Sequence, residues 1–218
     1  MPCSTDPLTP SVSIIWQDAD LLVVNKPSGL LTVPGRGPDK QDCLINRLLV
    51  DYPNSRIVHR LDQPTSGLVL VPQNHHAHKT LGKQFEQRQI SKRYLAVVGG
   101  LLEQDQGDIE LPLICDWPNR PRQMVDFANG KHALTRYRVI ARDNEKRRTR
   151  VALTPVTGRS HQLRVHMQAL GHPILGDNFY ATQTLRDASE RLLLHAEWIS
   201  FAHPVTGDTV SLECPSEF

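Results

Sequence analysis

The sequence predicts an α+β fold, in which a mixed or antiparallel sheet carries a few packed helices. Segments rich in β-branched and aromatic residues outnumber those with helical periodicity, and several follow one another without a helix between them. The 218 residues are 39% hydrophobic and 22% charged, which is typical of a folded globular protein. We expect a flexible N-terminus over residues 1–12 and a single domain over residues 13–218.

The first half of the chain predicts a β-hairpin, a helix, a strand and a second helix. In IIWQDADLLVVNKPSG, a polar turn separates an apolar pair from the strand Leu21–Val24. QDCLINRLLVDYP has helical spacing, with Asp42 as candidate N-cap and Pro53 as the stop. GLVLVP is typical of a buried strand, and HAHKTLGKQFEQRQISK, with Leu81 and Phe85 four residues apart, of an exposed helix.

The second half predicts five strands and one clear helix. The strands are expected in KRYLAVVGG, ALTRYRVIAR, RVALTPVTG, RLLLHAEWISFAHP and TVSLECP. GRSHQLRVHMQALGHP predicts a helix with Ser160 as the N-cap and Gly171 just beyond its end. Arg164 lies off the expected buried stripe, so packing does not require it. The stripe consists of Leu163, His166, Met167 and Leu170.

Charge, cysteine usage and hydropathy exclude several classes of protein. A net charge of +2 excludes a uniformly basic surface but allows a local basic groove. The four cysteines are scattered without a CxxC pair, which argues against a zinc ribbon or a disulfide framework and for reduced thiols. The N-terminus lacks a signal-peptide pattern, and the apolar runs are far shorter than the roughly 20 residues of a membrane span. We therefore expect a cytoplasmic protein without a membrane segment.

No sequence pattern predicts a metal or a cofactor. The HHAH group at residues 75–78 lacks an HExxH pattern or cysteines at finger spacing, and a solvated helix start explains it better. His161 and His166, five residues apart on a helix, lie on different faces. GxSxG, GxGxxG and GxxxxGK[ST] elements are missing. Any chemistry is therefore expected from side chains alone.

Two clusters of basic residues stand out. Such runs are usually solvated surface, but together on one lip of a cleft they would contact the phosphates of a nucleic acid. The clusters are Lys79, Lys83, Arg88, Lys92 and Arg93, and Arg142, Lys146, Arg147, Arg148 and Arg150.

The stretch HRLDQPTSG, from His59 to Gly67, has the composition of a turn, so by itself it makes Asp62 only a turn former. Its partners along the chain change this interpretation. VVNKPSGLLTVPG, HRLDQPTSGLVLV, KRYLAVV and GRSHQLRVHMQALGHPILGD, followed by RLLLHA, have the order and approximate spacing of motifs in the RluA family of pseudouridine synthases. The chain resembles that family from about Ile14 to its C-terminus, and such a linked set is far more specific than any one motif.

ICDWPNRPRQMV, from Ile114, resembles a dual-specificity branch of the family, which modifies a tRNA anticodon stem-loop and a 23S rRNA hairpin. Larger members carry an N-terminal S4 RNA-binding domain, and we expect none here because the motifs begin close to the first residue of the sequence. The resemblance implies a pseudouridine synthase fold, with a long, mixed, mainly antiparallel sheet and a central catalytic cleft. It also implies an enzyme without a cofactor or an obligatory protein partner, which we expect to be a monomer.

The resemblance further implies that Asp62 is the catalytic aspartate, that Tyr94 packs on the target base and that Arg164 pairs with Asp62. A carboxylate can act as a nucleophile or abstract a sugar proton, and a nearby guanidinium keeps it ionised in a water-poor cleft. Tyr94 could stack on a base or help to move the C5 proton, or be an ordinary strand aromatic.

The reacting uridine must leave its stack, so we expect base flipping. Arg60 would then fill the vacated space or hold a phosphate, unless it forms a salt bridge within the loop, and His59 is expected mainly to shape the loop. The residues expected to contact RNA are His59, Arg60, Lys92, Arg93 and Arg159.

Two other functions remain to be separated from this one. A non-catalytic RNA-binding module or RNA chaperone would not need the intact set of Asp62, Tyr94 and Arg164. A carboxylate-dependent glycosidase usually needs a second acid, and no motif marks one.

Overall fold

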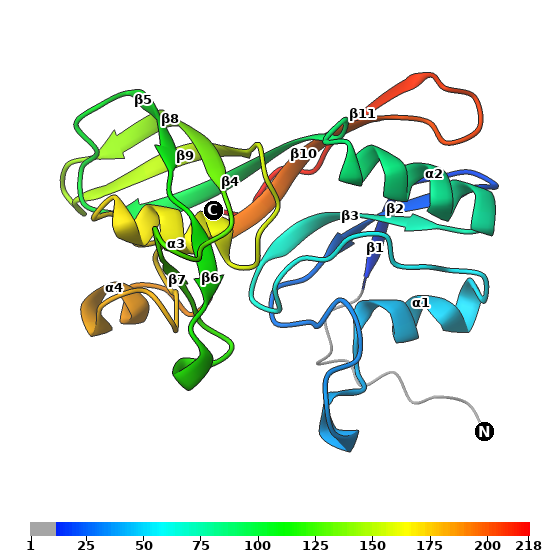
Figure 1. Cartoon of the computed structure of the whole chain (residues 1–218), viewed down its shortest axis with the longest axis horizontal. Helices are drawn as coiled ribbons and strands as arrows, with labels where there is room; N and C mark the ends of the chain where they lie inside the picture. The colour runs from blue at the N-terminus through cyan, green and yellow to red at the C-terminus, as the bar shows by residue number, and fades with distance from the viewer. Residues whose placement is uncertain (1–11) are drawn as a thin grey trace.

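The computed structural model describes residues 12–218 and shows one nine-stranded sheet with helices packed against it (Figure 1). The expected flexible segment 1–12 lies outside the described residues except for Val12. The helices are α1 (Leu44–Asp51), α2 (His75–Glu86), α3 (Gln162–Ala169) and α4 (Gln183–Asp187). The strands are β1 (Ser13–Gln17), β2 (Leu21–Lys26), β3 (Ser66–Pro72), β4 (Ser91–Gly99), β5 (Gln106–Glu110), β6 (Leu113–Cys115), β7 (Gln123–Val125), β8 (Leu134–Asp143), β9 (Arg148–Pro155), β10 (Leu194–Ala202) and β11 (Thr209–Glu213).

The strand order is β1-β2-β3-β10-β4-β9-β8-β5, with β11 paired to β10 and a separate hairpin formed by β6 and β7. Every neighbouring pair is antiparallel except β3 and β10. The predicted α+β class and mainly antiparallel sheet are thus confirmed. Within residues 12–218, no helix combines the length and apolar character needed to cross a membrane.

Helices cover the two halves of the sheet differently. On β2, alternate residues face opposite sides: Leu22 and Val24 pack into the core that contains residues of α1, whereas Leu21 and Val23 pack into the core beneath α2. The other half, built from β4, β9, β8 and β5, buries one face against α3. In Figure 1, α1 and α2 flank β3 on one side of the molecule and α3 lies over the other half.

The halves meet where β3 lies parallel to β10 over only two register pairs, Ser66 with His195 and Gly67 with Ala196. Gly67 has a φ of 113°, and a Cβ atom there would lie 2.4 Å from the carbonyl oxygen of Ala196. Only glycine fits this close approach. The last residue of HRLDQPTSG therefore closes the seam between the halves.

Two predicted helix starts are corrected. The N-cap of α1 is Cys43, and Asp42 instead forms an ion pair with Arg47 at 2.6 Å. The N-cap of α3 is His161 rather than Ser160, and its φ is 53°. A tight turn precedes the helix: the Arg159 N–H donates to Gln162 Oε1 at 3.0 Å, and the Gln162 N–H donates to the Arg159 carbonyl at 3.2 Å.

The expectation that packing does not require Arg164 is wrong. Its side chain is only 2% exposed, and residues 162–167 are all buried, because α3 contacts β8 and β9 as well as β7. His166 is buried as expected, with its Nδ1 2.9 Å from the Thr135 hydroxyl. Leu170, predicted for the buried stripe, is 38% exposed.

Candidate active site

A cleft of about 490 Å³ lies between the two halves of the sheet. Its walls come from the loop before β3, the start of β4, the end of β9 and the start of α3. Seven of the eight predicted site residues line it: His59, Arg60, Asp62, Lys92, Tyr94, Arg159 and Arg164. The cleft thus brings together motifs that are more than 100 residues apart.

The Asp62 loop is tied to residues 26–32 on both sides of the carboxylate. Before Asp62, the Thr32 hydroxyl donates to the Leu61 carbonyl at 2.8 Å. After it, the Gln63 carbonyl accepts from the Lys26 ammonium at 3.1 Å and from the Gly29 N–H at 2.9 Å. The Asp62 side chain itself is 27% exposed. These contacts fix the backbone while the carboxylate faces the cleft.

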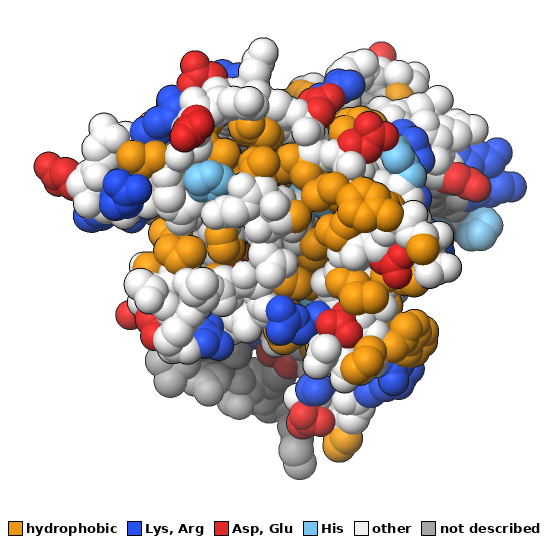
Figure 2. Space-filling model, turned by 60° about the vertical axis from the view of Figure 1, so that its left-hand side comes forward, with side chains coloured by type: hydrophobic (Ala, Val, Ile, Leu, Met, Phe, Trp, Pro, Cys, Tyr) orange, Lys and Arg blue, Asp and Glu red, His pale blue; other side chains and the backbone are white. Residues whose placement is uncertain are grey.

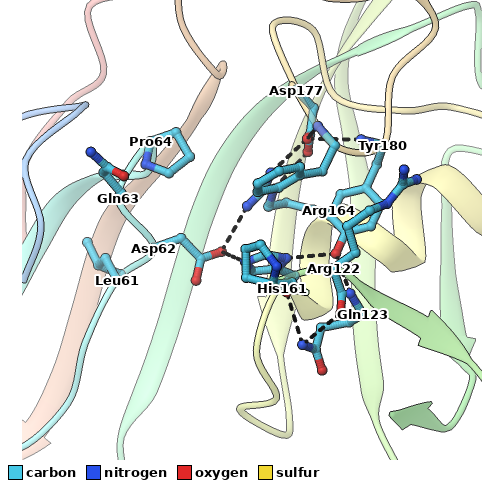
Figure 3. A network of polar contacts seen from close by, with 12 residues as sticks. Leu61, Asp62, Gln63, Pro64, Arg122, Gln123, His161, Arg164, Asp177 and Tyr180 are labelled. Carbon is cyan, nitrogen blue, oxygen red and sulfur yellow. Dashed lines mark hydrogen bonds and ion pairs between the residues drawn. The ribbon is translucent and has the colours of Figure 1, made fainter. Parts of the chain in front are cut away.

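Arg164 is the main cation beside Asp62. Its Nη1 lies 3.4 Å from Asp62 Oδ2, while its Nε and Nη2 both donate to the carboxylate of Asp177 at 2.7 Å. Burial alone would lower the pKa of Arg164, but the hydrogen bonds and charge of Asp177 raise it overall. Asp177 therefore holds the guanidinium in place, and its third nitrogen reaches Asp62 across the cleft (Figure 3).

His161 is the second group that faces Asp62. Its Nε2 lies 3.9 Å from Asp62 Oδ2, and its Nδ1 lies 2.7 Å from the Tyr180 hydroxyl. The ring stacks on Phe179 with 5.8 Å between the ring centroids. Burial lowers the pKa of His161, although the Asp62 charge opposes the effect. We therefore treat the imidazole as neutral near pH 7.

Tyr94, on β4, is half-buried and packs against the cores of both halves. Burial, and then the charge of Asp62, raise the pKa of its phenol well above the usual value. The phenol keeps its proton at neutral pH, so Tyr94 can stack or donate a proton but does not start as a base.

Arg93, which is predicted to contact RNA, does not line the cleft. Successive residues of a strand face opposite sides, so Lys92 and Tyr94 point to the cleft and Arg93 points away. Arg93 instead pairs with Glu197 at 3.0 Å and Glu213 at 2.7 Å. Its positive charge is thereby largely balanced on the opposite face.

Three other predicted RNA contacts differ in whether their side chains already form bonds within the protein. His59 Nε2 accepts the Leu70 N–H at 2.8 Å, and burial, with a smaller effect of Lys92, lowers the pKa of His59 to about 3. Arg60 is exposed and forms no ion pair with any residue in 12–218, so the salt bridge considered for it is not found there. Arg159 donates to the His132 carbonyl at 3.1 Å.

The two basic clusters do not share one lip of the cleft. Arg88 and Lys92 of the first cluster line it, but no member of the second does. In the second cluster, Arg142 pairs with Asp105 and Arg148 with Asp143. Figure 2 shows basic and acidic side chains interspersed on the face in view, without one dominant basic patch.

Asp177 and Tyr180 were missed from the sequence, although GHPILGD ends on Asp177. Their roles depend on a turn that directs Asp177 to Arg164 and Tyr180 to His161. That turn shows no periodicity, and an acidic residue after a glycine is common at the surface. The sequence signal for these roles is that GHPILGD belongs to the same motif as HQLRVH, which contains Arg164 and His161.

The candidate metal ligands have structural partners. Asp18, Asp20 and His203 place ligand atoms within 4.8 Å of one another, but Asp18 already accepts two backbone N–H groups and pairs with His203. In HHAH, the rings of His76 and His78 contact backbone carbonyls.

Residues 20–169, about two thirds of the chain, match the family model for RNA pseudouridylate synthase. The chain belongs to the RNA pseudouridylate synthase family. This synthase is 51% identical to the dual-specificity RNA pseudouridine synthase RluA of Yersinia pestis, over 94% of the chain and 99% of the relative. It is 49% identical to the protein of the same description from Escherichia coli strain K12, over 97% of the chain and 96% of the relative.

A solved structure extends the similarity. Human RNA Pseudouridylate Synthase Domain Containing 1 superposes on the synthase with a TM-score of 0.81 and 30% identity, covering 95% of this chain and 84% of the human chain. The expected pseudouridine synthase fold and the assignment as an RNA-modifying isomerase are confirmed. The comparisons support the enzyme rather than a non-catalytic RNA-binding module.

Proposed function

We propose that the synthase converts uridine to pseudouridine in structured RNA with Asp62 as the catalytic carboxylate. The observation that carries the assignment is the position of Asp62 in the cleft, with Oδ2 3.4 Å from a buried guanidinium. Arg164 places a positive charge beside the carboxylate in a cleft from which a flipped base would displace further water.

The reaction breaks the bond between N1 and C1′, turns the base and joins C5 to C1′. An ionised carboxylate can begin it by attack at C6 of the base, by attack at C1′, or by removal of a sugar proton. All three routes need a free carboxylate oxygen in the cleft. The C5 proton leaves after the new bond forms, and a proton goes to the nitrogen released from the sugar, so the reaction is balanced without a cofactor.

Tyr94 would stack on the base. Arg164 would hold Asp62 in place and would not itself touch the substrate. The protonated phenol of Tyr94 lies in the same cleft and could donate a hydrogen bond to the displaced base. Arg60, exposed at the rim, would fill the space left by the flipped uridine or hold a neighbouring phosphate. Lys92, Arg88 and Arg159 supply further positive charge along the cleft.

We propose a tRNA anticodon stem-loop and a 23S rRNA hairpin as the two substrates. The proposal extends to this chain the dual specificity of the two bacterial relatives and rests on identity over nearly the full length. We further propose a cytoplasmic monomer, in line with these substrates and with the free thiols of Cys43, Cys115 and Cys214.

The substitution Asp62→Asn tests the assignment, with exposed Asp51→Asn at the end of α1 as a matched control. Both RNAs are labelled with tritium at C5 of uridine, and tritium release is measured beside RNA binding. We expect Asp62→Asn to bind RNA but release no tritium, and Asp51→Asn to match the wild type. Substantial release by Asp62→Asn would disprove the catalytic role, and release from one RNA only by the wild type would disprove dual specificity.

A further inference from the structure

We infer that His161 is a positioning residue for the reaction: its Nε2–H orients Asp62, and the hairpin of β6 and β7 fixes its tautomer through Tyr180. The inference rests on the proposed function, because it takes Asp62 as the catalytic carboxylate. It assigns a role to a buried imidazole that the mechanism above does not use.

The backbone of His161 is held in an uncommon conformation. Its φ of 53° lies in the left-handed region, which few residues other than glycine, asparagine and aspartate adopt readily. The side chain is only 11% exposed and lies between Phe179, on which it stacks, and Tyr180, which it meets edge-on. The surrounding contacts therefore hold the ring in a fixed position, with Nε2 turned to Asp62.

The hydrogen bonds of Tyr180 determine the tautomer. The Tyr180 oxygen accepts the backbone N–H of Gln123, the first residue of β7, at 2.8 Å. Burial raises the pKa of Tyr180 to about 12, so the phenol keeps its one hydrogen at neutral pH. The other polar partner of this hydroxyl within residues 12–218 is His161 Nδ1, at 2.7 Å. The phenol therefore donates to Nδ1, and a neutral imidazole must carry its hydrogen on Nε2.

This tautomer presents a donor to the catalytic carboxylate. The Nε2–H of His161 and Nη1 of Arg164 both face Oδ2 of Asp62, at 3.9 and 3.4 Å. Both distances exceed those of a good hydrogen bond, and catalytic contacts of this kind tighten when substrate is bound. With Oδ2 held from two sides, Oδ1 is the oxygen turned toward the uridine.

The chain of contacts runs from the hairpin to the reacting group: Gln123 N–H to Tyr180, Tyr180 to His161, and His161 to Asp62 (Figure 3). Figure 3 shows Asp62 approaching from one half of the molecule and its partners from the other. The hairpin therefore contributes to the orientation of Asp62 without touching it.

The test compares His161→Asn with His161→Gln in the full-length protein. Both are amides, and asparagine tolerates the left-handed backbone well, but only the longer glutamine places an N–H near the position of Nε2. Pseudouridine formation is followed under single turnover at saturating RNA, and RNA affinity is measured separately. We expect His161→Asn to lower the rate about 100-fold at unchanged affinity, and His161→Gln to recover most of the loss.

Tyr180→Phe tests the hairpin contribution, because it keeps the ring and removes the hydroxyl. We expect its single-turnover rate to fall about 10-fold at unchanged RNA affinity, because either imidazole tautomer then becomes accessible. A wild-type rate in Tyr180→Phe would disprove the tautomer assignment.

For His161, a wild-type rate in the asparagine variant, or equal losses in the asparagine and glutamine variants, would overturn the inference. Asp62→Asn in the same assay separates this failure from that of the proposed function. If Asp62→Asn is inactive while both His161 variants match the wild type, only the role of His161 is lost.

Discussion

Lys26 is fully buried, and its ammonium supports the loop that carries Asp62. It donates to the carbonyls of Leu30 at 2.7 Å, Pro27 at 3.0 Å and Gln63 at 3.1 Å. Burial lowers the pKa of Lys26 to about 7, although the nearby Asp62 charge raises it. Its position next to Gln63 links the NKPSG turn to the backbone beside the catalytic carboxylate.

This pKa predicts how stability depends on pH. In the unfolded chain Lys26 keeps its proton up to a pH of about 10.5, whereas the folded protein releases it near pH 7. Between these values the unfolded state binds more protons, so this residue makes stability rise with pH, by at most about 1.4 kcal/mol per pH unit.

Urea unfolding at pH 7, 8 and 9 measures this contribution when wild type is compared with Lys26→Met. The variant is less stable throughout, because the carbonyls that Lys26 bonds lose their donor. We expect the wild type to gain stability relative to the variant as pH rises. Parallel pH dependences of the two proteins would contradict a lowered pKa.

The roles of single residues could be predicted from sequence to different extents. Asp62, Tyr94 and Arg164 were predicted from linked motifs, and the structure places all three in one cleft. The contact between Arg164 and Asp177 was not predicted, because it depends on the direction of a turn that has no sequence periodicity. His161 was predicted only as one residue of a helix, since its φ and its contact with Tyr180 have no local sequence signal.

At the level of elements, β4 separates two adjacent cations by strand alternation. Lys92 lines the cleft beside Tyr94, whereas Arg93 lies on the opposite face between two glutamates. Of these two cations, RNA in the cleft should therefore contact only Lys92.

We expect Lys92→Met to weaken RNA binding and to reduce the slope of log affinity against log salt by about 1. Arg93→Met, its matched control, should leave both unchanged. Filter binding across a salt series measures both quantities. An equal effect of the two substitutions would argue for RNA bound across both faces, and no effect of Lys92→Met would exclude this lysine as a phosphate contact.

Long apolar elements could be predicted from sequence better than short polar ones. The strands β3, β4, β9 and β10 have apolar or β-branched runs, and the structure confirms them. The strands β5, β6 and β7 were not predicted, because each is only three to five residues long, and β5 and β7 are partly polar. Short pairings of this kind depend on tertiary contacts, such as the Gln123 bond to Tyr180.

At the level of the whole molecule, substitution of Gly67 tests how the close approach of β3 to β10 stabilises the contact between the two halves. We expect Gly67→Ala to lower the free energy of unfolding by about 2 to 4 kcal/mol, because a Cβ would collide with the backbone of Ala196. Gly207→Ala is the control: its φ of 79° is also positive, but a Cβ there meets nothing within 4 Å. Chemical denaturation measures both. Equal losses would show that backbone strain, rather than the close approach, sets the requirement for glycine.

The position of β10 has a consequence for biosynthesis. This strand lies between β3 and β4 in space, yet it is made from residues 194–202, long after both. The ribosome therefore synthesises Asp62 and then Arg164 before it synthesises β10, the strand that joins the two halves of the sheet on which they lie. We expect the nascent chain to lack a working active site until its last strands emerge, so that catalysis on RNA begins only with the nearly finished protein.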